Sequence, residues 1–167
     1  MFCRVSYRNW IRPLAARSVF NGTLVGSLLT DGIKVGSFCE VKHAFSQEDV
    51  NLFATICGDN NPIHIDPVYA EGTMFKGTIV HGIFVSSLFS TLFGRAINGA
   101  IYVNQSMSFK RPVHVGVPVI AKMSIISIDE KKKGLLLSCS TQIFIAKEGT
   151  LAVDGKAEVL VPQEKKL

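Results

Sequence analysis

Residues 78–94 read TIVHGIFVSSLFSTLFG, and this stretch decides the fold. It contains no Asp, Glu, Lys or Arg, and on a helix its apolar residues would fall on every side. A helix of this kind is either buried or spans a membrane. At 17 residues, with His81 and several Ser and Thr, it is short and polar for a span, which needs about 20 apolar residues. The sequence therefore predicts a long, central, buried helix.

The sequence on either side of this helix predicts short helices and an antiparallel sheet. Before it, a strand is expected over 34–45, followed by a helix with Ser46 as N-cap and Gly58 at its end, and by a short helix opened by Asp66. After it come β-rich runs, with turns expected at 129–134 and 147–149. These runs cover 100–112, 117–128, 134–146 and 150–162. The order indicates an α+β fold in which a curved antiparallel sheet wraps round the long helix.

The charge of the chain is concentrated in its first 30 residues. The formal net charge is +5, yet residues 1–30 contain four arginines and no acidic residue. From Asp31 onward, 14 basic residues stand against 13 acidic ones, so the rest of the chain is nearly neutral. A nucleic-acid-binding function therefore loses its main support.

The first 30 residues have the pattern of a mitochondrial transit peptide. Arg4, Arg8 and Arg12 recur every four residues on one helical face, among apolar residues, Ser and Ala. The absence of a long apolar core argues against a secretory signal, although a simple basic tail is the alternative. We expect a leader over 1–30, cleaved between residues 17 and 32, and one domain over 31–167 in the mitochondrial matrix.

A second stretch, CGDNNPIH at residues 57–64, holds the side chains best suited to chemistry. Asp59 and His64 lie five residues apart, and Gly58, the two asparagines and Pro62 are turn formers. A loop stiffened in this way would hold a carboxylate and an imidazole in fixed directions, which suits proton transfer. Taken singly, an Asp in a turn and a His between two isoleucines are also ordinary structural residues.

These residues indicate metal or thiol chemistry less strongly than they indicate proton transfer. Asp59 and His64 offer two metal ligands without a visible third, whereas zinc sites use three or four protein ligands. The four cysteines show no metal-binding spacing, and Cys57 has no neighbouring pattern that would activate its thiol. With no nucleotide or flavin motif either, the sequence predicts chemistry without a metal or cofactor.

Residues 53–70, FATICGDNNPIHIDPVYA, resemble the signature of the MaoC-like family, which includes the R-specific enoyl-CoA hydratases, or hydratases 2. The segments IVHGIFVSSLF at 79–89 and AIYVNQSMSFKRPVHVG at 100–116 fit the same family, so the resemblance covers residues 34–162. It implies a single hot-dog fold that works as a homodimer or larger assembly. It also implies reversible removal of water from (3R)-hydroxyacyl thioesters of acyl-carrier protein or CoA, without a cofactor. With the leader, it implies a dehydratase of mitochondrial fatty acid synthesis.

The resemblance also implies roles for particular residues. In the family, an Asp and a His hold one water between them, and Asp59 and His64 match these positions. Asn61 and Pro62 match the loop that sets their geometry, and Ser87 matches a serine near the active-site pocket in relatives.

The long helix offers a further element of such a site. The thioester carbonyl must be polarised, and amides at a helix N-terminus can do this. The helix begins near His81 and Gly82, so we expect the oxyanion hole at Gly82 and a capping or packing role for His81.

Several alternatives stay open at this point. A hot-dog protein can also be an acyl thioesterase or a non-catalytic acyl-binding module, because a fold does not determine a function. Lys110 and Arg111 either end a solvated strand or contact a phosphopantetheine phosphate or an acidic carrier protein. Which of Asp59 and His64 takes the α-proton is undecided. The depth of the acyl pocket would depend on residues such as Phe84, Leu88, Tyr102 and Met107.

Overall fold

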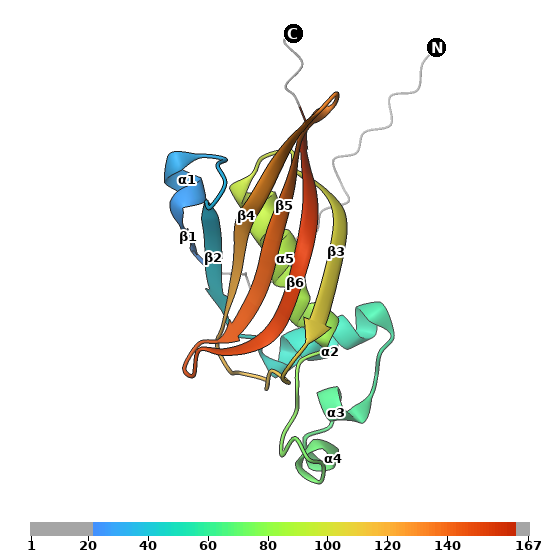
Figure 1. Cartoon of the computed structure of the whole chain (residues 1–167). Helices are drawn as coiled ribbons and strands as arrows, with labels where there is room; N and C mark the ends of the chain where they lie inside the picture. Colours follow the sequence, from blue (N-terminus) through green and yellow to red (C-terminus); the bar gives the residue numbers. More distant parts are fainter. Residues whose placement is uncertain (1–21, 163–167) are drawn as a thin grey trace, which may run out of the picture.

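The protein is a six-stranded antiparallel sheet curved round one long helix (Figure 1). The computed structural model describes residues 22–162. The strand order is β1-β2-β4-β5-β6-β3, so consecutive strands β4, β5 and β6 pair as hairpins while β3 crosses over to the far edge. The strands are β1 (Leu24–Val25), β2 (Phe38–His43), β3 (Ile101–Phe109), β4 (Val119–Lys131), β5 (Gly134–Ile145) and β6 (Thr150–Pro162). This α+β hot-dog architecture confirms the predicted fold class.

The strands differ in detail from the sequence prediction. β2 is shorter than the expected 34–45, and the turn between β4 and β5 is tighter than 129–134, because β4 continues to Lys131. β4 alternates buried and partly buried residues, with Val119, Ala121 and Met123 fully buried towards the core. This period of two is what a sheet covered on one face requires.

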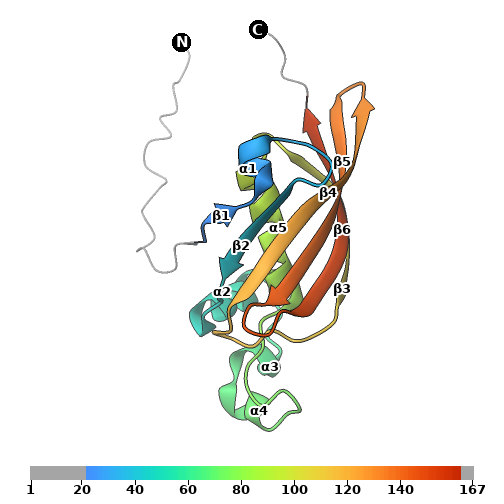
Figure 2. The same ribbon diagram turned by 60° about the vertical axis from the view of Figure 1, so that its left-hand side comes forward.

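The long helix α5 (Gly82–Ala96) lies against the concave face of the sheet, as Figure 2 shows. It begins four residues after the charge-free stretch does. Phe89 and Leu92 are completely buried against the sheet, and this removal of apolar surface from water stabilises the helix in the fold. The helix is not buried all round, however: Ile83 is 61% exposed, and Ser87 and Ser90 are also exposed. One face of α5 is therefore uncovered in the single chain.

The remaining helices are α1 (Ser27–Asp31), α2 (Gln47–Cys57), α3 (Pro62–Ile65) and α4 (Pro67–Glu71). The predicted N-cap of α2 is confirmed, and it forms a capping box, since the side chains of Ser46 and Asp49 each bond the other's backbone amide. Asp66 caps α4 as expected, with its carboxylate accepting from two amides of the first turn. α3 was not expected, because its residues had been interpreted as part of a loop. α2, α3 and α4 gather at one end of the sheet (Figure 1).

The structure describes only the last part of the segment predicted as a leader. Residues 1–21, which hold the Arg-rich pattern, lie outside the described residues. Residues 24–30 belong to the fold, since Leu24 pairs with Val41 of β2 and Leu28 is buried in the core. The folded domain thus begins before residue 31. Between residues 22 and 162, no helix combines the length and apolar character needed to cross a membrane.

Candidate active site

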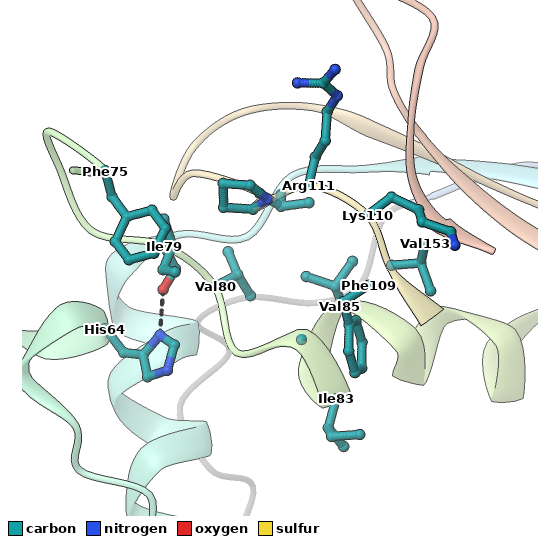
Figure 3. Close-up of a pocket in the computed structure, with 13 residues that line it drawn as sticks. His64, Phe75, Ile79, Val80, Ile83, Val85, Phe109, Lys110, Arg111 and Val153 are labelled. Atoms are coloured by element: carbon teal, nitrogen blue, oxygen red, sulfur yellow. Dashed lines mark hydrogen bonds between the residues drawn. The ribbon is translucent and has the colours of Figure 1, made fainter. Parts of the chain in front are cut away.

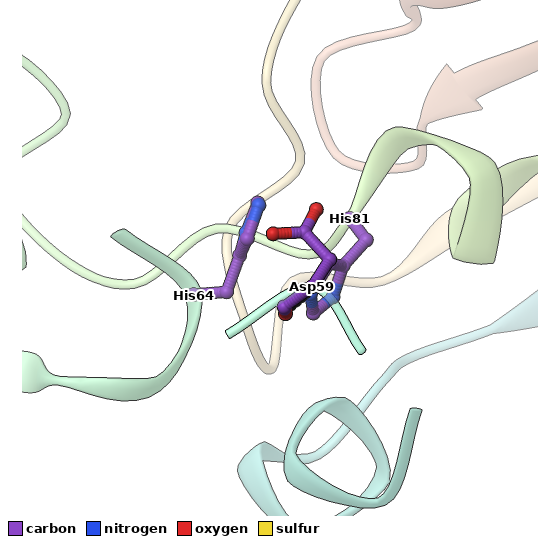
Figure 4. A group of neighbouring side chains, drawn as sticks. All are labelled: Asp59, His64 and His81. Carbon is purple, nitrogen blue, oxygen red and sulfur yellow. Dashed lines mark hydrogen bonds between the residues drawn. The ribbon is translucent and has the colours of Figure 1, made fainter. Parts of the chain in front are cut away.

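Two segments far apart in the sequence meet at the N-terminus of α5 and bring three proton-handling side chains together. One ligand atom each from Asp59, His64 and His81 lies within 4.8 Å of the other two. Figure 4 shows the Asp59 carboxylate beside the His64 ring, with His81 behind it. The sequence predicted the first two as a pair, and the structure adds the third.

Asp59 is positioned by the end of α2. Gly58 has φ 81°, a left-handed conformation that suits glycine, and its amide closes the helix on Ala54 O at 2.9 Å. The chain then turns, and Asp59 Oδ1 accepts from the amide of Asn61 at 3.2 Å. The Asp59 amide in turn donates to Cys57 Sγ at 3.4 Å. Asp59 is exposed, so its carboxylate can meet a ligand.

His64 is held by the short helix α3. Asn61 caps this helix through Oδ1, which accepts from the amide of Ile63, and Pro62 occupies the first helical position. His64 is only 8% exposed, and its Nδ1 lies 2.8 Å from Ile79 O (Figure 3). A carbonyl oxygen only accepts, so Nδ1 carries the hydrogen and Nε2 has the lone pair. Asn61 and Pro62 thus begin a helical turn that carries His64, where the sequence predicts a loop.

His81 supports both of these residues. It is 3% exposed, its Nε2 donates to the backbone oxygen of Asp59 at 3.0 Å, and its ring stacks on that of His64 with centroids 3.8 Å apart. Although His81 is the N-cap residue of α5, its side chain makes no cap bond. Within the described chain, its Nδ1 is buried without a hydrogen-bond partner. Of the predicted capping or packing role, the side chain of His81 fulfils the packing, and its contacts with Asp59 and His64 join segments that sequence spacing does not relate.

The N-terminus of α5 opens at the same place. The first amides of a helix have no intrahelical partner and carry a partial positive charge. With no side-chain cap from His81, these amides remain available to an anionic oxygen. A Cβ at Gly82 would lie 2.9 Å from Cε1 of Phe109, so a larger residue there would have to displace the Phe109 ring. The predicted oxyanion residue thus lies beside Asp59 and His64.

Two adjoining cavities meet at this site. A cavity of about 270 Å³ is lined by Phe53, Cys57, Asp59, His64, His81, Gly82 and Ile83. A second, of about 370 Å³, shares His64, Gly82 and Ile83 with the first and is otherwise mostly apolar, with Lys110 and Arg111 among its lining residues (Figure 3). A ligand with a polar centre and an apolar body would fit this combination.

Ser87 lies elsewhere. It is exposed one turn after Ile83, and its Oγ donates to the backbone oxygen of Phe84 at 2.6 Å. It lines neither of the two cavities but a separate hollow on the uncovered face of α5. Its predicted role in the pocket is therefore not supported by contacts within one chain.

The three clustered side chains also make a conceivable metal site, with the third ligand that the sequence did not reveal. Their geometry suits a metal poorly. The rings of His64 and His81 stack with only 27° between their planes, so in-plane lone pairs run side by side and do not converge on one point. One nitrogen of each ring is already engaged by a backbone oxygen. The arrangement is better suited to hold a water molecule and move protons.

The fold and the site together define a hot-dog protein with a carboxylate–imidazole pair at the N-terminus of its central helix. Residues 37–136 match the MaoC like domain family, and the chain belongs to this family. It is 39% identical over 132 residues to the (R)-specific enoyl-CoA hydratase of Aeromonas caviae, covering 78% of this chain and 96% of the relative. It is 33% identical over 130 residues to the mitochondrial 3-hydroxyacyl-[acyl-carrier-protein] dehydratase of Arabidopsis thaliana, covering 78% of each.

A solved structure agrees with these matches. The (R)-hydratase from A. caviae involved in PHA biosynthesis superposes with a TM-score of 0.73 at 39% identity, covering 78% of this chain and 98% of that one. The family and the hot-dog fold that the motif predicted are confirmed.

Proposed function

We propose that this protein is a hydro-lyase that reversibly removes water from (3R)-hydroxyacyl thioesters to give trans-2-enoyl thioesters. The observation that carries the proposal is that Asp59, His64 and the first turn of α5 line one cavity, where the carboxylate and an imidazole nitrogen lie within 4.8 Å of each other. Membership of the MaoC-like family and relatives named as hydratases and dehydratases support it.

The chemistry follows from what each group can offer. Elimination needs a base for the α-proton and an acid for the departing hydroxyl. Nε2 of His64 is a lone-pair acceptor because Nδ1 donates to Ile79 O, and an imidazole can take or give a proton near neutral pH. One oxygen of Asp59 accepts from Asn61, which fixes the carboxylate so that it can orient a water. The pair acts as one unit, and either member can take the α-proton.

The thioester carbonyl would bind at the start of α5. Enolate-like charge develops on its oxygen as the α-proton leaves, and amides in the first turn at Gly82 can stabilise this charge. A donor of this kind is worth about a hundredfold or more in rate. Because His64, Gly82 and Ile83 line both cavities, a carbonyl bound at this point would lie between the cavities and near Asp59 and His64.

The direct test is hydration of crotonyl-CoA by the purified chain and by two variants. Asp59→Asn and His64→Ala should each lower kcat by about 10²-fold or more, the usual loss when an acid–base group is removed. Asp66→Asn is a matched control, because Asp66 also ends in an exposed carboxylate but caps α4 through backbone amides that Asn can also bond. Circular dichroism confirms that each variant is folded. Full activity in either site variant would refute the pair.

The thioesterase and binding-module alternatives make different predictions. Hydrolysis would release free CoA thiol, which a thiol reagent detects, and we expect none. A binding module would retain affinity for acyl thioesters but show no turnover. The paired acid and base in the site favour the hydro-lyase, since binding alone needs neither group.

The proposal extends to the compartment in which the enzyme works and to the carrier of its substrate. Action on acyl-carrier-protein thioesters in the mitochondrial matrix is supported by the Arg-rich leader and by a relative named as mitochondrial. Because Leu24 pairs with β2 and Leu28 is in the core, cleavage of the leader should fall before Leu24. Sequencing the N-terminus of the protein recovered from mitochondria tests this.

A homodimer is supported by the edge strand β3. Ile101 and Val103 are 51% and 54% exposed on this strand, which among residues 22–162 pairs with β6 alone. Unpaired, apolar edge strands are rare in monomers because they attract other strands. Val103→Lys should convert a dimer into monomers in analytical ultracentrifugation. A wild-type monomer would contradict the proposed assembly.

A further inference from the structure

The larger cavity carries a pair of cations that the proposed elimination does not use. Lys110 and Arg111 follow β3 directly and line this cavity together with His64 and Gly82. Figure 3 shows their charged ends at its periphery, on a different side from His64. Most of the remaining lining is apolar, with Phe75, Val80 and Val85 as examples. One cavity thus joins the acid–base pair to a basic rim.

The backbone of this basic pair is fixed. The amides of Lys110 and Arg111 both donate to the oxygen of Ala152 on β6, at 2.8 Å and 3.2 Å. Phe109, the preceding residue, packs its ring against Gly82 at the start of α5. The two cations therefore emerge at a defined place, one and two residues beyond the ring that contacts the helix terminus.

No acidic side chain in the described part of the chain neutralises these two charges. Both side chains are exposed, and neither forms an ion pair with any residue between 22 and 162. An adjoining hollow contains Lys110 and another lysine, Lys156. Its one carboxylate, Asp154, accepts a hydrogen bond from Gln142 at 3.1 Å. The rim keeps an excess of positive charge, which attracts anions.

We propose that Lys110 and Arg111 bind the phosphate of a phosphopantetheine arm whose thioester reaches His64 and Gly82. This inference rests on the proposed function. It orients the substrate in the cavity, with the acyl thioester at the N-terminus of α5 and the phosphate at the rim. The apolar walls suit the methylene segments of the arm. An arginine fork matches phosphate oxygens in two parallel hydrogen bonds, and a lysine adds a point charge. The same arm occurs in CoA and in acyl-carrier protein, so both sources present the same phosphate.

The test compares four crotonyl thioesters that differ only beyond the reacting group: pantetheine, 4′-phosphopantetheine, CoA and holo acyl-carrier protein. The variant Lys110→Ala/Arg111→Ala removes the proposed phosphate contact. Lys132→Ala/Lys133→Ala removes the same charge from the exposed turn between β4 and β5, which Figure 1 shows at the end of the sheet away from α3. Steady-state kcat and KM are measured for all combinations at two salt concentrations.

We expect the rim variant to lose at least about tenfold in kcat/KM on the three phosphate-containing thioesters, through KM, which corresponds to about 1.4 kcal/mol. On the pantetheine thioester it should match the wild type, and the control variant should match it throughout. High salt should lower the kcat/KM of the wild type on the phosphorylated substrates and change that of the rim variant less. Similar losses for CoA and carrier protein would support the arm phosphate as the shared ligand.

Several results would overturn the proposal. A loss of the same size on the pantetheine thioester would mean that the variant damages the site itself. Unchanged kinetics on 4′-phosphopantetheine would exclude the phosphate contact, and a loss confined to CoA would assign the cations to its nucleotide. If the wild type hydrates none of the four thioesters, the proposed function fails first, so the two failures are distinguishable.

Discussion

Replacing His81 separates two contacts that its imidazole makes in the site. Nε2 donates to the backbone oxygen of Asp59 at 3.0 Å, and the ring stacks on His64 at 3.8 Å between centroids. His81→Phe keeps a ring of similar size but loses the donor. His81→Gln keeps an amide donor but loses the ring. Of the two variants, His81→Phe should therefore be the more stable and His81→Gln the more active.

The stability of His81→Phe follows from two opposing terms. Loss of the hydrogen bond to Asp59 costs about 1 kcal/mol, a typical net value. The variant also removes Nδ1, which is buried without a partner among the described residues and which costs about 1–3 kcal/mol in that state. Together these two terms put the free energy of unfolding of His81→Phe between about the wild-type value and about 2 kcal/mol above it. His81→Gln leaves a void beside His64 and should lose about 1–3 kcal/mol.

The activities should rank the other way. Without the donor, nothing from His81 restrains the backbone at Asp59, and a shift of about 1 Å in a reacting group can cost about 10²-fold in rate. We therefore expect kcat on crotonyl-CoA to fall by roughly 10²-fold in His81→Phe and by less in His81→Gln. Both quantities are measured on the same samples, by urea unfolding and by the loss of enoyl absorbance.

Ser37→Ala is the matched control for a lost side-chain-to-carbonyl bond. Ser37 is 5% exposed, and its Oγ donates to Gly32 O at 2.9 Å, before β2 and in contact with neither cavity. It should lose about 1 kcal/mol of stability with kcat unchanged. The reasoning is refuted if His81→Phe keeps wild-type kcat, or if the activities of the two His81 variants simply follow their stabilities.

Three further perturbations test other parts of the structure. Gly82→Ala should displace the half-exposed ring of Phe109, 2.9 Å from the new Cβ, and lower kcat/KM by roughly tenfold with little loss of stability; unchanged kinetics would show that the close contact is unimportant. Leu92→Ala should lower the free energy of unfolding by about 2–5 kcal/mol, measured in urea, since Leu92 is fully buried. Burial raises the pKa of the Cys39 and Cys139 thiols to about 11 from 9.0. Their contribution to stability is complete below pH 9.0 and is lost as the pH rises towards 11, so a Cys39→Ala/Cys139→Ala variant should show a weaker decline in urea midpoint over that range than the wild type.

The helix ends were predictable because their signals are local. The capping box of α2 joins Ser46 and Asp49 within one turn, and Asp66 caps α4 through amides two and three residues away. The charge-free stretch likewise predicted α5, because a helix of this composition is stable only when most of it is buried. The exposed face of α5 was not predictable, since periodicity reports that residues are apolar and not which of them the rest of the chain reaches.

The candidate active site was also predictable only in part. Asp59 and His64 could be proposed as a pair because they share one short segment with several turn-forming residues. The role of His81 and the neighbourhood of Lys110 could not, because each depends on contacts between segments far apart in the sequence. The structure brought His81 under His64, and the end of β3 to the start of α5.

From the sequence alone, the long helix, the caps of α2 and α4, the α+β class and the proposed pairing of Asp59 with His64 could be predicted, since caps, turns and alternation act over a few residues. The sequence did not predict β1, α1 or α3. Only the tertiary structure decided that β3 pairs with β6 and that its basic end lines the cavity. It also decided that the first residues of α5 line one cavity with Asp59 and His64. These arrangements depend on how a curved sheet closes round one helix, and that packing is decided by burial summed over the whole chain rather than by any one segment.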